Sequence, residues 1–276
     1  MAFVTGASRG IGRASAIALA EAGFDVVVTA RTMKEGESAD GRPLPGSVET
    51  TAEAVRERGA LALALPLDLL DRASMEAALE ATLSQWGRID VLLNNGIYTG
   101  PGSLVHFLDL ELDEVETIFR ANVFSQIFLT QRVLPRMLER GDGTVINMVS
   151  AAGMSDPPAP ADRGGWGYAY GASKAAFLRM VGVLAVEHAG PGLRFFNLEP
   201  GFVVTEAMKL NDPEGQFSAR YGGAPPEVPA AVVAWLAASP AAREWNGKTV
   251  PAQKLCRKLG LHPEWRPQAP RGSDGD

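Results

Sequence analysis

Short apolar runs alternate along the chain with longer segments in which apolar residues recur every three or four positions. The short runs are typical of buried strands, and the longer period is typical of helices that pack on one side. Strands are therefore predicted at residues 2–4, 24–30, 61–67, 91–93, 144–148, 193–198 and 248–250, and helices at 11–22, 48–58, 74–86, 112–138 and 170–190. This order predicts an α/β fold with a single Rossmann-like, doubly wound parallel sheet of about seven strands, flanked by helices on both faces.

The chain has 276 residues, a length that fits one large α/β domain or two small ones. Hydrophobic residues make up 46% of it, enough for a sizeable core, and no break in composition marks a second domain. We therefore predict one Rossmann-fold domain over residues 1–250. Residues 251–276 are expected to form an irregular C-terminal extension that becomes disordered. Residues 32–47 are rich in Gly and Pro and predict a long excursion after the second strand.

Charge, hydropathy and cysteine content bear on the partners and the cellular location of the protein. With 26 Lys and Arg against 32 Asp and Glu, the net charge is −6, and no basic run would follow a phosphate backbone, so nucleic acid is not an expected partner. No uninterrupted apolar run approaches the roughly 20 residues that span a bilayer, and we expect no membrane segment. Cys256 is the only cysteine, and a structured motif begins within five residues of the start, so a cytoplasmic location is expected.

A glycine-rich turn joins the first strand to the first helix. Its spacing is Gly-x3-Gly-x-Gly, which differs from the general dinucleotide fingerprint but occupies the same strand–turn–helix context. Such a turn points backbone N–H groups and a helix N-terminus at a phosphate, and its glycines permit a close backbone approach. The alternative is a structural turn without a ligand. The candidate binding residues in this turn are Gly6, Ser8, Arg9, Gly10, Ile11 and Gly12.

The end of the second strand carries Ala30-Arg31, where many NAD-binding sites have an acid that accepts from the ribose 2′-OH. An arginine would instead grip a 2′-phosphate with charge-assisted bonds of about 1.5–3 kcal/mol. Arg9 could add to the same pocket. Either arginine could equally be a solvated surface charge, but the pair without a competing acid favours NADP(H).

The sequence Tyr170-Gly171-Ala172-Ser173-Lys174 places a phenol and an ammonium four residues apart. On a helix these side chains share one face, with Cβ atoms about 5–6 Å apart. A cation at that distance would favour phenolate and lower the pKa of the tyrosine, which a proton donor to a carbonyl requires. Ser150 follows the fifth strand directly and so lies at the carboxyl edge, where open sheets bind ligands.

Several further motifs accompany these residues in a fixed order: Asn94-Asn95, Asn122, and Pro200-Gly201-x3-Thr205. Taken as a set from residue 2 to residue 250, the motifs resemble the short-chain dehydrogenase/reductase family. Within that family the chain is most similar to the NADP(H)-preferring oxidoreductases, because Arg31 stands where an acid is otherwise expected.

The resemblance implies a role for each residue. Tyr170 would give or take a proton, Lys174 would lower its pKa and bind the nicotinamide ribose, Ser150 would hold the substrate oxygen, and Asn122 would anchor a water. The implied catalytic set is Asn122, Ser150, Tyr170 and Lys174, and no metal site is expected. The implied cofactor-binding set contains the glycine turn, Arg31, Tyr170 and Lys174. It also contains Asp68 and Leu69 at the adenine and Asn95 near the adenosine ribose. At the nicotinamide carboxamide it contains Pro200, Gly201, Val203 and Thr205.

Each of these residues also has a purely structural interpretation. A serine after a strand is often a turn or cap residue, Asn122 could be an amide on a helix surface, and Asp68 could be the N-cap of the next helix. Tyr168 lies near Tyr170 but lacks the cation four residues on, and it is a candidate wall of a substrate pocket.

The chain departs from the family pattern in four places. It reads Asn94-Asn95-Gly96-Ile97 where the family usually has Asn-Asn-Ala-Gly, and residues 155–166 are surplus and could form a flap over the substrate. Glu199 precedes Pro200 where a small or apolar residue is usual, and it would need a partner there. The usual Gly-Gly finish is also missing.

The leading hypothesis is an NADP(H)-dependent oxidoreductase that interconverts a ketone or aldehyde and an alcohol, with the tyrosine as acid and base. One alternative is a regulator that binds NADP(H) without catalysis, and another is an NAD(H)-dependent alcohol dehydrogenase. The expected partner is a small carbonyl or alcohol substrate. By analogy, a homodimer or homotetramer is expected through the helices at residues 112–138 and 170–190.

Overall fold

Seven parallel strands form the centre of the protein within the residues that the structure describes. The computed structural model describes residues 1–37, 44–188, 190, 192–211, 214, 222–262 and 264–265. The strands lie in the order β3-β2-β1-β4-β5-β6-β7. Their bounds are Ala2–Thr5 for β1, Val26–Ala30 for β2, Ala62–Pro66 for β3, Val91–Asn94 for β4, Gly143–Met148 for β5, Leu193–Glu199 for β6 and Thr249–Pro251 for β7. The predicted doubly wound sheet is confirmed, and its order reverses between β1 and β4.

The register of the strands divides their apolar side chains between two faces, because successive residues of a strand point to opposite sides. One buried row runs across the sheet through Phe3, Val27, Leu92, Val145 and Phe195. The next residue of each strand contributes to a second row, through Val4, Val28, Leu93, Ile146 and Phe196. Both faces therefore need a cover of helices.

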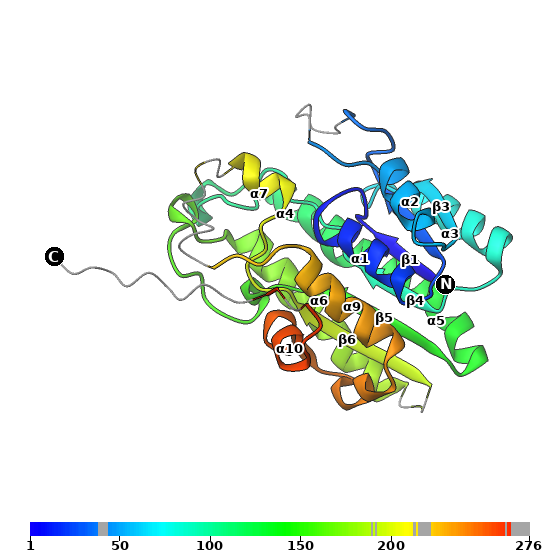
Figure 1. Ribbon diagram of the computed structural model, residues 1–276. Coiled ribbons are helices and arrows are strands. Elements are labelled where there is room, and N and C mark those ends of the chain that lie inside the picture. Colours follow the sequence, from blue (N-terminus) through cyan, green and yellow to red (C-terminus); the bar gives the residue numbers. More distant parts are fainter. Residues whose placement is uncertain are drawn as a thin grey trace.

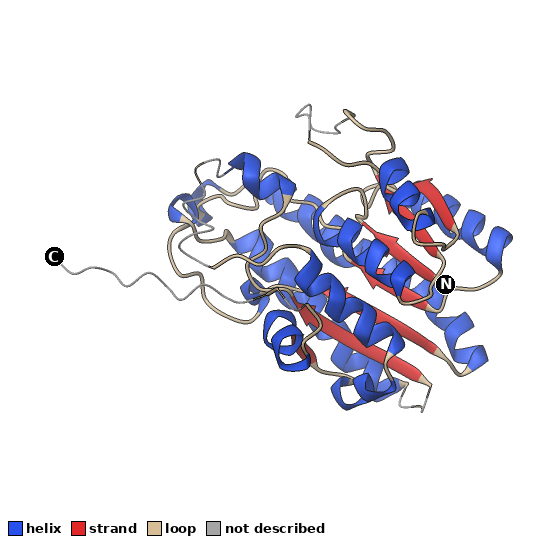
Figure 2. Ribbon diagram, in the orientation of Figure 1, coloured by secondary structure: helices blue, strands red, loops and turns tan. Residues whose placement is uncertain are grey.

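Helices cover the two faces in two layers, with the strands between them (Figures 1 and 2). One layer packs α1 (Gly10–Glu21), α2 (Val48–Arg56), α9 (Glu227–Ala238) and α10 (Ala252–Leu259) against the sheet, with α1 and α9 side by side. The other layer contains α3 (Arg72–Trp86), α5 (Ser125–Arg140) and α6 (Tyr168–Glu187). The helix α4 (Leu112–Phe119) packs on α6, and the short α7 (Glu206–Asn211) lies beyond the carboxyl ends of the strands (Figure 1). Short 3-10 turns lie at Phe107–Asp109 (η1), Ala151–Gly153 (η3), Ala161–Arg163 (η4) and Pro240–Trp245 (η5).

The long helix predicted at residues 112–138 is interrupted. Between α4 and α5 the chain forms one π-helical turn, η2, at Arg120–Phe124. The hydroxyl of Ser125 donates to the carbonyl of Arg120 at 2.9 Å, and the Ser125 amide donates to the same carbonyl. A periodic pattern does not reveal one added residue, so the prediction of a single uninterrupted helix was wrong. Such turns occur frequently at functional sites.

The segment after β7 is helical, in contrast to the irregular extension expected there. In α10 the buried residues Ala252, Leu255 and Cys256 lie on one side, which packs against α9, and Gly260 ends the helix with φ of 64°. This apolar spacing explains the helix. Residues 266–276, for which disorder was expected, lie outside the described residues.

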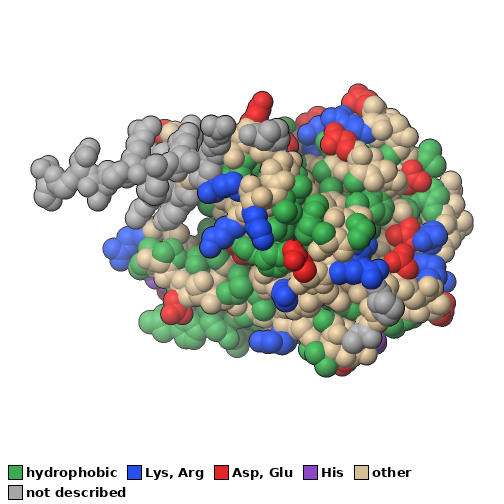
Figure 3. Space-filling view, turned by 60° about the horizontal axis from the view of Figure 1, so that its bottom comes forward, with side chains coloured by type: hydrophobic (Ala, Val, Ile, Leu, Met, Phe, Trp, Pro, Cys, Tyr) green, Lys and Arg blue, Asp and Glu red, His purple; other side chains and the backbone are tan. Residues whose placement is uncertain are grey.

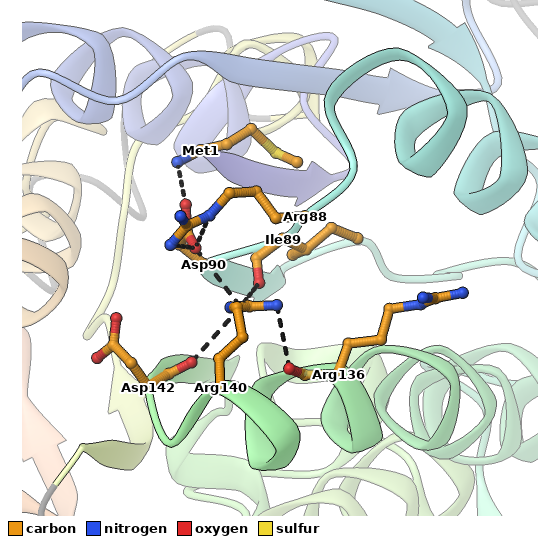
Figure 4. A network of polar contacts seen from close by, with 7 residues as sticks. All are labelled: Met1, Arg88, Ile89, Asp90, Arg136, Arg140 and Asp142. Carbon is orange, nitrogen blue, oxygen red and sulfur yellow. Dashed lines mark hydrogen bonds and ion pairs between the residues drawn. The ribbon is translucent and has the colours of Figure 1, made fainter.

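A polar network ties together the amino ends of the strands (Figure 4), at the edge opposite α7 (Figure 1). The Met1 amino group donates to Asp90 at 2.6 Å, and Arg88 donates to the same carboxylate at 2.7 Å. Arg140 of α5 donates to the carbonyl of Ile89 at 2.7 Å. Burial raises the pKa of Asp90, but the bonds from the amino group and Arg88 outweigh it and leave the pKa lowered. The network fixes the end of the sheet that carries no candidate site residue.

The helix α6 is long and apolar enough to cross a membrane by length and composition alone. In this fold it packs against β5, β6 and η3, and it carries the Tyr170 and Lys174 pair. On the face drawn in Figure 3, Lys and Arg side chains are interspersed with Asp and Glu.

Candidate active site

The glycine turn forms at the carboxyl end of β1, where the chain enters α1. Gly6 and Gly10 have φ of 66° and 55°, a region that residues with a Cβ rarely adopt. A Cβ on Gly12 would lie 2.2 Å from the carbonyl oxygen of Gly6, so only glycine fits there. Ser8 is buried within the turn, and Ile11 lies in the first turn of α1. The turn and the N-terminus of α1 have the form of a phosphate cradle.

Asn95 supports the glycine turn from β4. Its side-chain amide donates to the carbonyls of Thr5 at 2.9 Å and Gly6 at 3.2 Å. The hydroxyl of Thr5 in turn accepts from the amides of Asn95 at 3.0 Å and Gly96 at 2.8 Å. Asn95 thus shapes the cradle, and its predicted contact with the adenosine ribose stays a prediction. Thr5 is a supporting residue to which the sequence analysis assigned no role.

Gly96, one of the departures from the family pattern, lies against Gly6. A Cβ on Gly6 would be 2.7 Å from the Cα of Gly96. A Cβ on Gly96 would lie 3.2 Å from both Thr5 Oγ1 and Leu69 Cδ1, tighter than ordinary van der Waals contact. The two strand ends therefore approach closely because both positions lack a side chain.

The two candidate arginines on the adenosine side differ in what they contact. Arg9 donates to the backbone carbonyls of Pro45 at 3.1 Å and Gly46 at 2.9 Å, so it holds the excursion against the turn. Arg31 is exposed at the end of β2 and makes no hydrogen bond or ion pair within the described residues. Of the two, Arg31 has the guanidinium available for a 2′-phosphate. Part of the excursion, residues 38–43, lies outside the described residues.

Asp68 and Leu69 follow β3 and form a turn at the same edge of the sheet. The carboxylate of Asp68 accepts from the amide of Leu70 at 2.9 Å, and the Leu69 carbonyl accepts from the Ser125 hydroxyl. The N-cap of α3 is Asp71, which accepts from Ala73 at 2.9 Å. The cap interpretation of Asp68 is therefore wrong, and its contact with adenine stays a prediction.

Ser150 and Tyr170 meet at the carboxyl end of β5. The Ser150 side chain accepts from the amide of Ala152 at 3.2 Å. It also lies near enough to Tyr170, in the first turn of α6, to affect the pKa of the phenol. Burial raises the pKa of Tyr170 above its ordinary value, and the nearby Ser150 hydroxyl offsets this in part. The phenol is therefore protonated at neutral pH and lies beside a hydroxyl that can hold a substrate oxygen. Ser150 also has the turn or cap role that was given as its structural interpretation, because it accepts from the amide of Ala152 while lying beside Tyr170.

Lys174 lies one helical turn after Tyr170 and is buried. Its Nζ donates to the backbone carbonyl of Met148 at 2.8 Å and lies 5.6 Å from the ring centroid of Phe177. Burial lowers the pKa of Lys174 to about 8. The predicted spacing on one helix is confirmed, but the predicted acidification of the phenol is wrong for this structure. The ammonium is bonded to a carbonyl of β5, and the shift of the Tyr170 pKa follows from burial and Ser150.

Asn122 lies inside the π-helical turn and is buried, so the interpretation as a surface amide is wrong. Its side-chain oxygen accepts from the amide of Tyr98 at 2.8 Å, and its side-chain nitrogen donates to the Tyr98 carbonyl at 3.0 Å. These two bonds fix the loop after β4 beside the site. The water that the family resemblance implies at Asn122 stays a prediction.

The turn after β6 is held by side chains on either side of it. Glu199 accepts from the amide of Gly201 at 2.8 Å, which supplies the partner that this carboxylate needs. Gln253 of α10 donates to the carbonyls of Pro200 at 3.1 Å and Phe202 at 3.0 Å. Sequence analysis missed Gln253 because nothing in the spacing of a C-terminal extension indicated a helix that returns to the site.

The same segment ends at the N-terminus of α1. A Cβ on Gly10 would lie 3.1 Å from Thr205 Cγ2, and the amide of Gly10 donates to the carboxylate of Glu206 at 2.9 Å. Glu206 begins α7 and was also missed from sequence. Its carboxylate lies where a helix N-terminus attracts an anion, so a phosphate that binds there must displace it.

The surplus residues 155–166 line part of a separate, open cavity of about 710 Å³. Trp166 and Tyr168 line it together with the small residues Gly171 and Ala172 of α6. His106 and Asp162 lie 2.9 Å apart near its rim. Tyr168 thus lines a cavity as expected, but neither Ser150 nor Tyr170 is among the described residues that line it. The flap over the substrate stays a prediction.

A family model for short chain dehydrogenases matches residues 1–215. The chain belongs to the short-chain dehydrogenase family. It is 33% identical over 253 residues to a 3-oxoacyl-[acyl-carrier-protein] reductase of Synechocystis. The matched region covers 90% of this chain and 93% of that reductase. It is 34% identical over 208 residues to mouse dehydrogenase/reductase SDR family member 7, covering 75% of this chain and 56% of the relative.

Solved structures agree with this membership. A short-chain type dehydrogenase/reductase from Mycobacterium marinum superposes with a TM-score of 0.75 at 26% identity, covering 91% of this chain and 92% of that one. The protein is accordingly an oxidoreductase that acts on CH–OH groups, in a family that binds a nicotinamide cofactor. The turn from Gly6 to Gly12 fits the diphosphate of such a cofactor, because it brings the N-terminus of α1 to the carboxyl edge of the sheet, where a helix attracts an anion. Within the described residues no group of three His, Cys, Asp or Glu is placed to hold a metal.

Proposed function

We propose that the protein interconverts a ketone or aldehyde and an alcohol with NADP(H). The observation that carries this proposal is the placement of Ser150 beside Tyr170 at the carboxyl end of β5, one helical turn from Lys174 and at the same sheet edge as the N-terminus of α1. A nicotinamide cofactor supplies or accepts the hydride. The residues of the chain bind it, hold the carbonyl oxygen and move one proton.

In the reducing direction, Ser150 donates a hydrogen bond to the carbonyl oxygen and stabilises the negative charge that develops on it. Tyr170 gives the proton of its hydroxyl to that oxygen, which completes the alcohol and leaves a phenolate. The raised pKa of Tyr170 keeps the proton on the phenol until it is needed. Lys174 is cationic below a pH of about 8, and in this proposal it binds the nicotinamide ribose, the other role that the family resemblance implies for it. Oxidation of an alcohol reverses these steps.

The choice of NADP(H) rests on Arg31. It is exposed directly after β2, follows Ala30 instead of an acid, and has no partner among the described residues. A 2′-phosphate would give it a charge-assisted contact. In this proposal Asp68 and Leu69 lie at the adenine, and Pro200, Gly201, Val203 and Thr205 lie at the nicotinamide.

The named relatives guide the choice of substrates. Because the Synechocystis and Staphylococcus aureus relatives are 3-oxoacyl-[acyl-carrier-protein] reductases, a 3-oxoacyl thioester belongs in any substrate panel. We also propose a homodimer or homotetramer in the cytoplasm. Leu112 and Phe124 on the α4–α5 side, and Val183 and Val186 on α6, are exposed apolar side chains that a second copy would cover.

The experiment is a screen of ketones, aldehydes and 3-oxoacyl thioesters that follows consumption of NADPH, repeated with NADH. We expect turnover of at least one carbonyl class, faster with NADPH. Tight binding of NADPH without turnover in either direction, with NADP⁺ and secondary alcohols included, would instead favour the noncatalytic regulator. Turnover with NADH alone would favour the NAD(H)-dependent dehydrogenase.

A further inference from the structure

One side chain from the C-terminal helix holds the backbone turn after β6, together with backbone bonds in which Ala224 N–H donates to the Phe202 carbonyl at 2.9 Å and Val204 N–H donates to the Ala224 carbonyl at 2.9 Å. Both hydrogens of the Gln253 side-chain amide are used, one for the carbonyl of Pro200 at 3.1 Å and the other for that of Phe202 at 3.0 Å. Gly201 lies between these two carbonyls with φ of 73°, and a Cβ there would be 2.2 Å from Gln253 Nε2. The amide therefore occupies the space that the glycine leaves free.

The position of Gln253 is set by the sheet and the core. Pro251 pairs with Glu199 in the register of β6 and β7, so the chain begins α10 directly beside the turn. Ala252 and Leu255, on either side of Gln253 in sequence, are buried against α9 and the sheet. A side chain in the first turn of an anchored helix is well suited to holding a loop in one conformation.

The carbonyl of Phe202 and the amide of Val203 belong to one peptide plane. Because this bond is trans, the N–H of Val203 points away from the Phe202 carbonyl, which accepts from both Gln253 and the Ala224 amide. Val203 is buried, and its N–H makes no hydrogen bond within the described residues. Buried backbone donors are nearly always paired, so this one is arranged for a ligand.

We propose that Gln253 is a positioning residue for cofactor binding: it orients the turn so that the Val203 N–H faces the nicotinamide carboxamide. This inference rests on the proposed function, since the cofactor must bind at this edge of the sheet. It extends the site into a segment beyond residues 1–215, the part that the family model matches. Gln253 touches no reacting atom, and its effect passes through the turn.

The test measures binding to the full chain of two probes: NADPH, and 2′,5′-ADP, which carries the adenosine end without the nicotinamide. In Gln253→Leu, which keeps the approximate size but donates nothing, NADPH should bind roughly tenfold to thirtyfold more weakly. This range corresponds to two neutral hydrogen bonds. Binding of 2′,5′-ADP should stay within twofold of wild type. Lys254→Leu, at the exposed neighbouring residue of α10, is the matched control and should change neither affinity.

The outcomes separate the inference from the function on which it rests. If the wild-type protein binds neither probe, the proposed function fails before any variant is compared. If Gln253→Leu weakens both probes equally, or leaves NADPH unchanged, the positioning role is overturned. Gln253→Glu, which keeps the shape but turns the donor into an acceptor facing two carbonyls, should weaken NADPH at least as much. Gln253→Glu replaces Gln253→Leu in this test if the leucine variant does not fold.

Discussion

Glu206→Gln should make the protein bind NADPH more tightly. In the structure the Glu206 carboxylate accepts from the amide of Gly10 at the N-terminus of α1, at 2.9 Å. An anion near a helix N-terminus is worth about 0.3–1 kcal/mol, and up to about 2 kcal/mol when partly buried. A cofactor diphosphate that takes this place must first break the bond and then tolerate the nearby charge. The neutral amide holds the N-terminus less strongly and does not repel the phosphates.

For this partly exposed side chain we take a magnitude of about 1 kcal/mol, which corresponds to a roughly fivefold lower Kd for NADPH. The assay is a binding titration of NADPH at low, fixed ionic strength, repeated at high salt, where screening should shrink the difference. Glu227→Gln is the matched control, because Glu227 is an exposed acid that lines the same 330 Å³ cavity as Glu206 but makes no bond to Gly10.

Glu227→Gln removes the same charge nearby and should change the Kd by less than twofold. The reasoning is refuted if Glu206→Gln weakens NADPH binding or leaves it unchanged, or if the control gains as much.

Three further predictions follow from the same geometry. Burial lowers the pKa of Lys174 to about 8, so the cost of burying its charge, about 3 kcal/mol, is present below pH 8 and fades as the pH rises toward the unfolded pKa near 10.5. Lys174→Met should therefore raise the free energy of unfolding in urea by about 2 kcal/mol at pH 7, since the gain is reduced by loss of the bond to Met148. The gain should shrink toward pH 9.5. A variant less stable than wild type at pH 7 would contradict this reasoning. Arg31→Asp should lower kcat/KM for NADPH roughly tenfold to a hundredfold and leave kcat/KM for NADH unchanged, so the ratio of the two values should fall by that factor. An equal loss for both cofactors would count against the 2′-phosphate assignment. Gly12→Ala should lower the Tm sharply and abolish NADPH binding, because the added Cβ would meet the Gly6 carbonyl at 2.2 Å; a variant that melts and binds like wild type would show that the turn is not fixed as described.

The sheet was predictable because both of its faces are buried. Strands such as β2, with Val26, Val27 and Val28 in a row, have no polar face and are bounded by glycine or charged residues. The spacing of Tyr170 and Lys174, the proposed catalytic pair, was predictable because helical spacing fixes which residues share a face. Within α6 that spacing holds whatever packs around the helix.

Features that depend on tertiary contacts were not predictable. The π-helical turn that buries Asn122 adds one residue to a single helical turn. The apolar period of the sequence continues across it, so the pattern gives no sign of the added residue. The raised pKa of Tyr170 follows from the depth of burial, which a pattern of residue types does not specify. Glu206 and Gln253 reach the site from segments 196 and 51–53 residues away from the groups they bind.

The central claim is that the Tyr170 hydroxyl transfers the proton, and Tyr170→Phe tests it most directly. The variant loses one oxygen atom and keeps the ring that packs in the site. Once a substrate is found, kcat should fall roughly a hundredfold to ten-thousandfold, the usual contribution of general acid catalysis, while the Kd for NADPH stays within about twofold of wild type. A variant that retains wild-type turnover would contradict the account.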